Sequence, residues 1–324
     1  MSRPFAPRLR VSSYLSAWMP TGDETRQAVA GYVGGGYTDA TGRTNVIDRL
    51  AFPAETKTTL GATLSVTNYD LSTAANSGVA GYFAGGSSSA FNPTAVIDKL
   101  AFPAETRSST TSLSSARMQM CGFANSGVAG YFAGGYYTSA TISGIDKITF
   151  SADTVSTLAA TVSPASRYGA GFSNNGVAGY IAGKDNGTGT YYDAIDKITF
   201  SADTKTTLVA VLTSARSTAA GFADSEVAGY CAGGTTGAFV SGIDKITFSA
   251  DTKTTLSATL TTGASGSAGF ANTGVAGYVC AGYDGVRLDR IDKIAFPADT
   301  KTTLAAVLSV VVSSTSGLAD CGVF

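Results

Sequence analysis

Two stretches, Val-Ala-Gly-Tyr-Phe-Ala-Gly-Gly at 128–135 and Ile-Asp-Lys-Ile-Thr-Phe at 145–150, decide how this chain folds. Close copies of both recur along the sequence. The Gly-Tyr pair recurs at Tyr32, Tyr82, Tyr131, Tyr180, Tyr230 and Tyr278. The Asp of the second stretch recurs at Asp48, Asp98, Asp146, Asp196, Asp244 and Asp292, each followed four residues later by Phe. Successive copies lie 48 to 50 residues apart, so the chain is an internal repeat.

Each repeat contains four short strand-like runs. In the unit around Tyr131 they are 121–125, 128–133, 145–150 and 155–162, separated by turn residues such as Ser126-Gly127. Runs of this length fit strands and are too short for helices. Four strands in a unit of about 50 residues is the arithmetic of a β-propeller blade.

The two ends of the chain indicate that the ring of blades closes on itself. The segment 317–323 matches 269–275, the first strand of a unit, and nothing follows it. The first unit, conversely, starts at Ala28 with its second strand. We therefore predict an all-β fold, a six-bladed β-propeller of four-stranded antiparallel blades. The C-terminal strand pairs into the N-terminal blade, which removes two free sheet edges. The predicted organisation is an N-terminal arm at 1–27 and the propeller at 28–324.

The double glycine of 79–86 and 128–135, followed by a loop and two more strands, resembles the kelch repeat. The Trp usual in the fourth kelch strand is replaced by Leu60, Leu158, Leu208, Leu256 and Leu304. The first-strand Arg of that family appears only at Arg117, Arg167 and Arg216. The likeness is therefore one of architecture. The Ile-Asp-Lys-Ile-Thr-Phe-Ser-Ala-Asp-Thr stretch is also similar to repeats of uncharacterised bacteriophage and bacterial propeller proteins, which implies a viral or bacterial setting.

Composition and charge exclude several classes of partner. Hydrophobic residues make up 44% and charged residues 14%, enough apolar side chain for a packed core. The net charge of −1 gives no reason to expect nucleic acid. No apolar run is long enough for membrane insertion, and the N-terminus does not read as a secretory signal. The four cysteines are far apart, without a CxxC pair, and are expected to be buried free thiols.

Catalytic residues are poorly supplied. The chain has no His, which removes Ser-His-Asp and Cys-His chemistry and imidazole metal sites. Because the repeated Asp occurs in every unit, we interpret it as an inter-blade or strand-end hydrogen-bonding residue. The basic residue after it is expected to lie on a solvated strand face, paired with acidic neighbours, with a ring of charge as the alternative. The glycines lack the helix and Lys-Ser/Thr of a phosphate loop. We predict no enzyme, no metal and no cofactor; a glycoside hydrolase using acids such as Asp39, Asp185 or Asp193 remains a less favoured alternative.

The loop between the second and third strands differs in every unit. Such loops share one face of a propeller with the links between blades, while the near-identical short turns lie on the other face. Loops rich in Tyr, Ser, Gly and Asn resemble adaptable recognition surfaces, although drift without function is an equal alternative. The hypothetical binding residues are Tyr37, Phe91, Tyr136, Tyr137, Tyr191, Tyr192, Phe239, Tyr283 and Arg287.

The first 27 residues form a basic, aromatic arm outside the repeat. It carries the single Trp of the chain, and we expect it to dock along the propeller or onto another subunit; a degenerate blade strand is the rival interpretation. The assembly residues of the arm are Arg3, Arg8, Arg10, Tyr14 and Trp18.

These features favour a non-catalytic structural or binding protein. We expect a phage virion component, in a capsid decoration, tail or fibre, that binds other virion proteins or a host-surface receptor or glycan. The alternative is a secreted or surface lectin-like propeller. Homo-oligomerisation is left open by the sequence, and fold alone does not identify a ligand.

Overall fold

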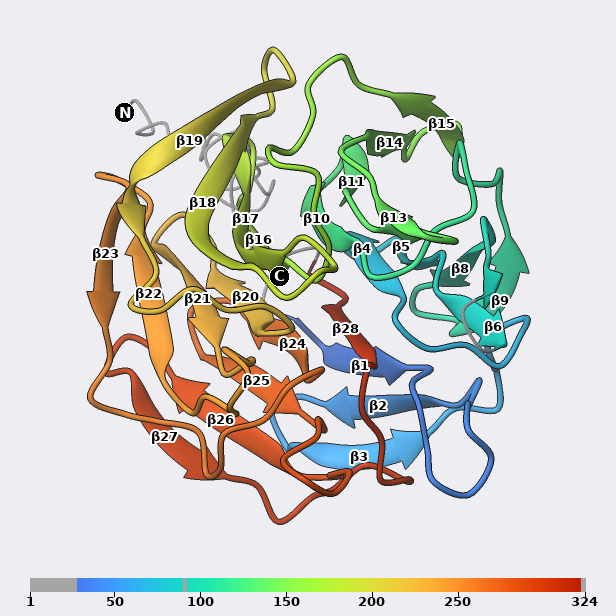
Figure 1. Ribbon diagram of the computed structural model, residues 1–324. Helices are drawn as coiled ribbons and strands as arrows, with labels where there is room; N and C mark the ends of the chain where they lie inside the picture. The colour runs from blue at the N-terminus through green and yellow to red at the C-terminus, as the bar shows by residue number, and fades with distance from the viewer. Residues whose placement is uncertain (1–27, 90–91, 322–324) are drawn as a thin grey trace, which may run out of the picture.

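The computed structural model describes residues 28–89 and 92–321, which form a disc of sheets arranged radially about one axis (Figure 1). Within these residues there are six four-stranded antiparallel sheets, so the predicted six-bladed propeller is confirmed. The predicted arm at 1–27, with Arg3, Arg8, Arg10, Tyr14 and Trp18, lies outside the described residues.

Each blade has one strand at the axis and three further out. Blade 1 contains β28 (Ser316–Ala319), β1 (Ala30–Gly34), β2 (Ile47–Ala51) and β3 (Thr56–Thr59). Blade 2 contains β4 (Ser72–Asn76), β5 (Ala80–Ala84), β8 (Ile97–Ala101) and β9 (Thr106–Ser109). Blade 3 contains β10 (Cys121–Asn125), β11 (Ala129–Ala133), β14 (Ile145–Thr149) and β15 (Thr154–Thr157). Blade 4 contains β16 (Ala170–Asn174), β17 (Ala178–Asp185), β18 (Tyr191–Thr199) and β19 (Thr204–Val211). Blade 5 contains β20 (Ala220–Asp224), β21 (Ala228–Ala232), β22 (Ile243–Thr247) and β23 (Thr252–Thr255). Blade 6 contains β24 (Ala268–Asn272), β25 (Ala276–Cys280), β26 (Ile291–Ala295) and β27 (Thr300–Thr303).

Two loops carry small hairpins of their own. They are β6 (Ser87–Ser89) with β7 (Asn92–Pro93), and β12 (Tyr136–Tyr137) with β13 (Ala140–Thr141). The outer strands are shorter than the run 155–162 predicts: β15 ends at Thr157. Beyond it the chain leaves the sheet toward the next blade, and the backbone N–H of Val162 bonds to the carbonyl of Ser143 instead. Strand β19, with eight residues, is the longer exception.

The ring closes as the sequence predicts. Strand β28 pairs antiparallel with β1, from Gly31 opposite Ala319 to Gly34 opposite Ser316. The innermost strand of blade 1 therefore comes from the C-terminal end of the chain and the other three from its beginning (Figure 1). Because β28 covers the inner edge of β1, that edge is not left unpaired at the axis.

The repeated Tyr and Phe hold neighbouring blades together. Each Tyr of a second strand stacks on the Phe that follows the third strand of the next blade, with ring centroids 5.0 to 5.2 Å apart. The pairs are Tyr32–Phe102, Tyr82–Phe150, Tyr131–Phe200, Tyr180–Phe248, Tyr230–Phe296 and Tyr278–Phe52. Because the last pair joins blade 6 to blade 1, the aromatic layer is continuous around the disc. Stacked pairs of this kind stabilise beyond the area that they bury.

The same tyrosines anchor a second ring of polar contacts. Each phenolic hydroxyl donates to an acidic residue in the short turn of the next blade at 2.7 to 2.9 Å. That carboxylate also accepts the basic residue that follows the repeated Asp. These ion pairs are Arg49–Glu105, Lys99–Asp153, Lys147–Asp203, Lys197–Asp251, Lys245–Asp299 and Lys293–Glu55, at 2.5 to 2.8 Å. The predicted pairing of the basic residues with acidic neighbours is thus confirmed.

Glycine in the second strand allows the blades to approach closely. A Cβ at Gly179 would lie 2.0 Å from the ring of Phe123 in the preceding blade. The same contact recurs at Gly229 against Phe172 and at Gly277 against Phe222. A side chain at any of these three positions would therefore overlap the preceding blade.

In five blades the repeated Asp accepts hydrogen bonds from the link that arrives from the preceding blade. In blade 4, Asp196 instead accepts from Lys184, Lys205 and Thr207 of its own blade. Asp146 accepts both the backbone N–H and the hydroxyl of Ser114, and Asp48 does the same with Ser309. In blade 3 the buried Arg117 approaches Asp146 at 2.5 Å, and in blade 5 Arg216 lies 3.1 Å from Asp244. These two arginines of the links therefore form buried ion pairs beneath the loops. The inter-blade interpretation is thus confirmed for Asp48, Asp98, Asp146, Asp244 and Asp292.

The cysteines are free and buried, as predicted: Cys121, Cys231, Cys280 and Cys321. Burial raises the pKa of the Cys121 and Cys280 thiols well above its ordinary value, which makes them unreactive. The described part of the chain contains no helix with the length and apolar character needed to cross a bilayer.

Candidate functional site

All the variable loops emerge on one face of the disc, which we call the loop face. Strand β5 ends at Ala84 opposite Ser72, where β4 begins, so the loop after β5 and the link before β4 lie on the same side. The opposite side, the turn face, carries the short turns between first and second strands and between third and fourth strands. The sequence analysis predicted this division, with loops and links on one face and short turns on the other, because successive strands run in opposite directions.

Four of the predicted binding residues come together with Tyr69 in a contiguous group, the aromatic arc. Tyr69 and Tyr37 meet edge to face at 5.5 Å, and Phe239 and Tyr283 do so at 5.7 Å. The guanidinium of Arg287 joins them, at 4.5 Å from the Tyr37 ring and 5.7 Å from the Tyr283 ring. Phe239 is 42% exposed and Tyr283 36%, so the arc presents aromatic surface to solvent.

A second aromatic group lies in the loop of blade 3. Tyr136 and Tyr137 form strand β12, and Tyr137 is 47% exposed. Arg167, from the next link, stacks at 5.2 Å over Tyr136 and 5.1 Å over Tyr168. The structure therefore links this loop to the residues that surround the axis.

The remaining predicted residues are placed differently. Tyr191 and Tyr192, expected in a variable loop, lie in strand β18, where they pair with Asp185 and Lys184. The correction has a physical reason: the second and third strands of blade 4 continue their ladder past a bulge, so backbone pairing replaces the loop. Both are only partly exposed. Phe91 lies outside the described residues.

The residue two positions before the start of each inner strand belongs to a backbone ring around the axis on the loop face. These residues are Asp70, Gln119, Tyr168, Thr218, Gly266 and Ser314. Each has a positive φ of 52° to 64°, and each backbone N–H donates to the carbonyl of the preceding member at 2.8 to 3.0 Å. Because Asp70 donates to Ser314, the ring is closed. We call it the axial ring.

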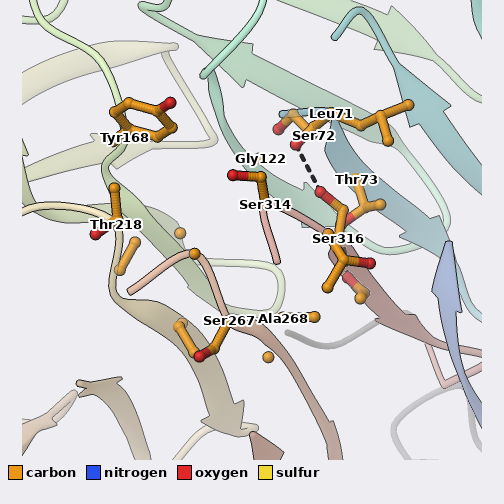
Figure 2. Close-up of a pocket in the computed structure, with 18 of the residues that line it drawn as sticks. Leu71, Ser72, Thr73, Gly122, Tyr168, Thr218, Ser267, Ala268, Ser314 and Ser316 are labelled. Atoms are coloured by element: carbon orange, nitrogen blue, oxygen red, sulfur yellow. Dashed lines mark hydrogen bonds between the residues drawn. The ribbon is translucent and has the colours of Figure 1, made fainter. Parts of the chain in front are cut away.

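The axial ring surrounds a cavity of about 110 Å³, the axial cup. Figure 2 shows Ser72, Thr218, Ser267, Ser314, Ser316 and Tyr168 around it. The lining reaches down to the inner-strand glycines Gly122, Gly171, Gly221, Gly269 and Gly317. Thr73 occupies the equivalent position in blade 2, and its hydroxyl donates to the carbonyl of Gly317 at 2.6 Å. The cup is therefore built by all six blades but is not six-fold symmetric.

The polar side chains gather on one side of the cup. Oδ2 of Asp70 accepts the side-chain amide of Gln119 at 2.9 Å and the hydroxyl of Tyr168 at 2.8 Å. Arg167 donates to Gln119 Oε1 at 2.9 Å and to Asp185 at 2.8 Å. On the opposite side the ring members are the small Thr218, Gly266 and Ser314. One side of the cup is thus a hydrogen-bonded cluster, and the small residues on the other side leave the cavity open.

The carboxyl group of Asp70 is the unusual member of this cluster. Its residue is only 5% exposed, and its Oδ1 atom has no hydrogen-bond partner among the described residues. Burial raises the pKa of the Asp70 carboxyl above its ordinary value, although the side chains of Gln119, Tyr168 and Ser314 and the charge of Arg167 lower it by favouring the charged form. Buried polar atoms are nearly always paired, so an unpaired one in the wall of a cavity is a candidate for ligand contact.

Sequence reasoning missed this cluster. Asp70, Gln119 and Tyr168 stand at one repeat position but are three different residue types, so the recurrence that revealed the core did not reveal them. Comparing that single position across the units would have shown large polar residues in three adjacent units and small ones in the other three. No group of three or more potential ligating side chains suited to a metal ion occurs within 28–89 and 92–321.

Comparison with known proteins assigns no family. No protein-family model matches the chain, and no curated protein resembles it at a significant level.

Proposed function

We propose that the protein is a non-catalytic binding or assembly module that engages its partner through the loop face. The observation that carries this proposal is the aromatic arc, in which Tyr37, Arg287, Tyr283 and Phe239 come from three different blades and leave aromatic surface exposed. Aromatic and Arg side chains are enriched in protein interfaces, where they supply large contact area at low entropic cost. Two of the three acids considered for a hydrolase, Asp39 and Asp185, form ion pairs with Arg287 and Arg167.

A virion is the setting that we propose, with capsid, tail or fibre proteins or a host receptor as partners. Its support is the likeness of the repeat to those of uncharacterised bacteriophage and bacterial propeller proteins, together with the near-neutral net charge and the basic, aromatic arm in the sequence. A rigid disc whose ring is closed by strand pairing suits a part that is exposed outside the cell. Purified virions from the source of this sequence should contain the chain in fixed stoichiometry; its absence from particles would contradict the setting.

The loop face can be tested separately from the setting. We expect the double variant Phe239→Ala and Tyr283→Ala to lose partner capture from purified particles while its thermal unfolding is unchanged. The matched control is Val128→Ala with Val227→Ala, two side chains that are each 49% exposed on the turn face. Equal loss in both double variants, or no loss in the first, would contradict a loop-face interface.

Glycan binding is the second candidate. The exposed rings of Tyr137 and Tyr283 could stack on sugar faces, with Arg287 beside them as a hydrogen-bond donor. A glycan array probed with the intact chain should then give a small set of related sugars, and Tyr137→Ala or Tyr283→Ala should remove them. An array without signal would leave the protein-partner proposal standing and remove this candidate.

A further inference from the structure

Most hydroxyl groups that line the axial cup already donate a hydrogen bond, whereas the Ser72 hydroxyl has no partner among the described residues. Thr73, Thr218, Ser267, Thr315 and Ser316 each donate to a backbone carbonyl. Figure 2 marks one such bond, from Ser316 Oγ to the carbonyl of Leu71. A hydroxyl that already donates can offer only its oxygen lone pairs to a ligand. The wall of the cup is consequently rich in acceptors.

The side chains of the polar cluster point to the same conclusion. The Gln119 amide and the Tyr168 hydroxyl both donate to Asp70 Oδ2. Arg167 donates to Gln119 and to Asp185. None of these bonds reaches Oδ1 of Asp70, which stays unpaired in the described residues. The cup thus combines one buried carboxylate oxygen with neutral acceptors, and the nearby Arg167 is already engaged by Asp185.

We propose that the axial cup binds a primary ammonium group, with Asp70 as its counter-ion. An ammonium group brings three donors and one positive charge, which match an acceptor-lined wall with one free carboxylate oxygen. A dehydrated divalent cation would need six or more oxygen ligands, and usually several carboxylates, whereas Asp70 is the acidic residue in the lining. The cavity of about 110 Å³ holds the ammonium group and a short carbon chain.

The ammonium group has two sources, a small free amine or a lysine side chain of a partner. This proposal deepens the loop-face function and rests on it only for the second source, since the cup opens on that face. Binding of a small amine needs no partner. Failure of the amine experiment therefore removes this inference and leaves the loop-face proposal to its own test.

Isothermal titration calorimetry on the full chain at neutral pH tests the proposal. Ethylammonium chloride should bind, whereas ethanol, which lacks the charge, and tetramethylammonium chloride, which lacks the N–H donors, should not. Equal binding of ethanol, tighter binding of calcium chloride, or no binding of ethylammonium would overturn it. Titration with Nα-acetyl-lysine methylamide then separates the sources: binding at least as tight as that of ethylammonium assigns a lysine side chain, and weaker binding assigns a small amine.

Asp70→Asn should weaken ethylammonium binding at least about tenfold, because a charge-assisted hydrogen bond becomes a neutral one. The matched control Asp289→Asn removes a carboxylate outside the cup lining and should bind like the parent chain. An unchanged affinity in Asp70→Asn would contradict the assignment.

The pH dependence gives a second readout that needs no variant of Asp70. Affinity should fall as the pH is lowered through the raised pKa of Asp70, since the protonated carboxyl loses its charge. The charged and titratable neighbours are Arg167, Tyr168 and Asp185; Arg167 stays protonated, and burial keeps the pKa of Tyr168 well above its ordinary value. The fall should persist in Asp185→Asn. An affinity that is flat with pH would overturn the role of Asp70 even if the Asn variant does not fold.

Discussion

The turn face and the loop face of the disc differ in how closely the six blades repeat one another. On the turn face every blade supplies a Tyr, a basic residue and an acidic turn residue at equivalent positions, and each trio joins two blades. On the loop face the blades differ in length, sequence and local structure, from the β12–β13 hairpin to the extended β17 and β18.

The difference shows where the repeat is constrained by closure. A ring of six units closes only if the rotations at its six interfaces add up to a full turn, and copying the contacts that set the rotation in each blade meets this condition. The loops lie beyond the buried Asp and link contacts and do not affect the rotation. Variation is therefore tolerated there, and it is there that a binding surface can arise without loss of the fold.

Removing the closing strand is expected to have the largest effect. Deletion of residues 317–324 takes away most of β28, the inner strand of blade 1, and exposes β1 as a sheet edge. The structure of both faces should be lost together. Thermal unfolding, measured by circular dichroism, should no longer show a cooperative transition. A truncated chain with the melting temperature of the parent would contradict the role of strand pairing in closure.

The second-largest effect on the free energy of unfolding should come from the buried ion pairs beneath the loops. Asp146→Asn leaves the buried Arg117 without its counter-charge, and breaking a buried pair in this way costs about 3–5 kcal/mol. Chemical denaturation measures this loss. The control is Asp292→Asn, whose Arg290 partner is 3.4 Å away and 19% exposed, so its loss should be clearly smaller. Equal effects would show that burial of the arginine does not matter.

How much of this could be predicted from sequence follows the same division. The Gly-Tyr and Ile-Asp pairs recur because they make the interfaces, so the blade number, the closure and the roles of the repeated Asp and Lys could all be read from recurrence. The axial cluster could not, because Asp70, Gln119 and Tyr168 act together only after closure brings three links to one axis. Tyr191 and Tyr192 have high strand propensity, but the equivalent segments of the other repeats are loops, so recurrence gave no sign that these residues would extend β18.

A single methyl group added between two blades should be enough to destabilise the fold. Gly179→Ala puts a Cβ 2.0 Å from the buried Phe123 ring, and overpacking of a filled core costs about 1–3 kcal/mol. Gly61→Ala is the matched control, because nothing lies within 4 Å of its Cβ. Denaturation midpoints of the two variants should differ; if they coincide, the blades are looser than their contacts indicate.

The smallest effect on stability should come from the loop face itself. Tyr137 is 47% exposed at the edge of the β12–β13 hairpin, and Tyr137→Ala should change the free energy of unfolding by no more than about 0.5 kcal/mol. Tyr131→Phe removes only a hydroxyl, yet it should cost about 1–2 kcal/mol because that hydroxyl donates to the Asp203 carboxylate across a blade interface. Denaturant titration of both variants compares the faces directly. If deleting a whole exposed ring destabilises more than deleting one hydroxyl, the loops carry part of the closure, and the freedom to vary that a binding surface requires would be lost.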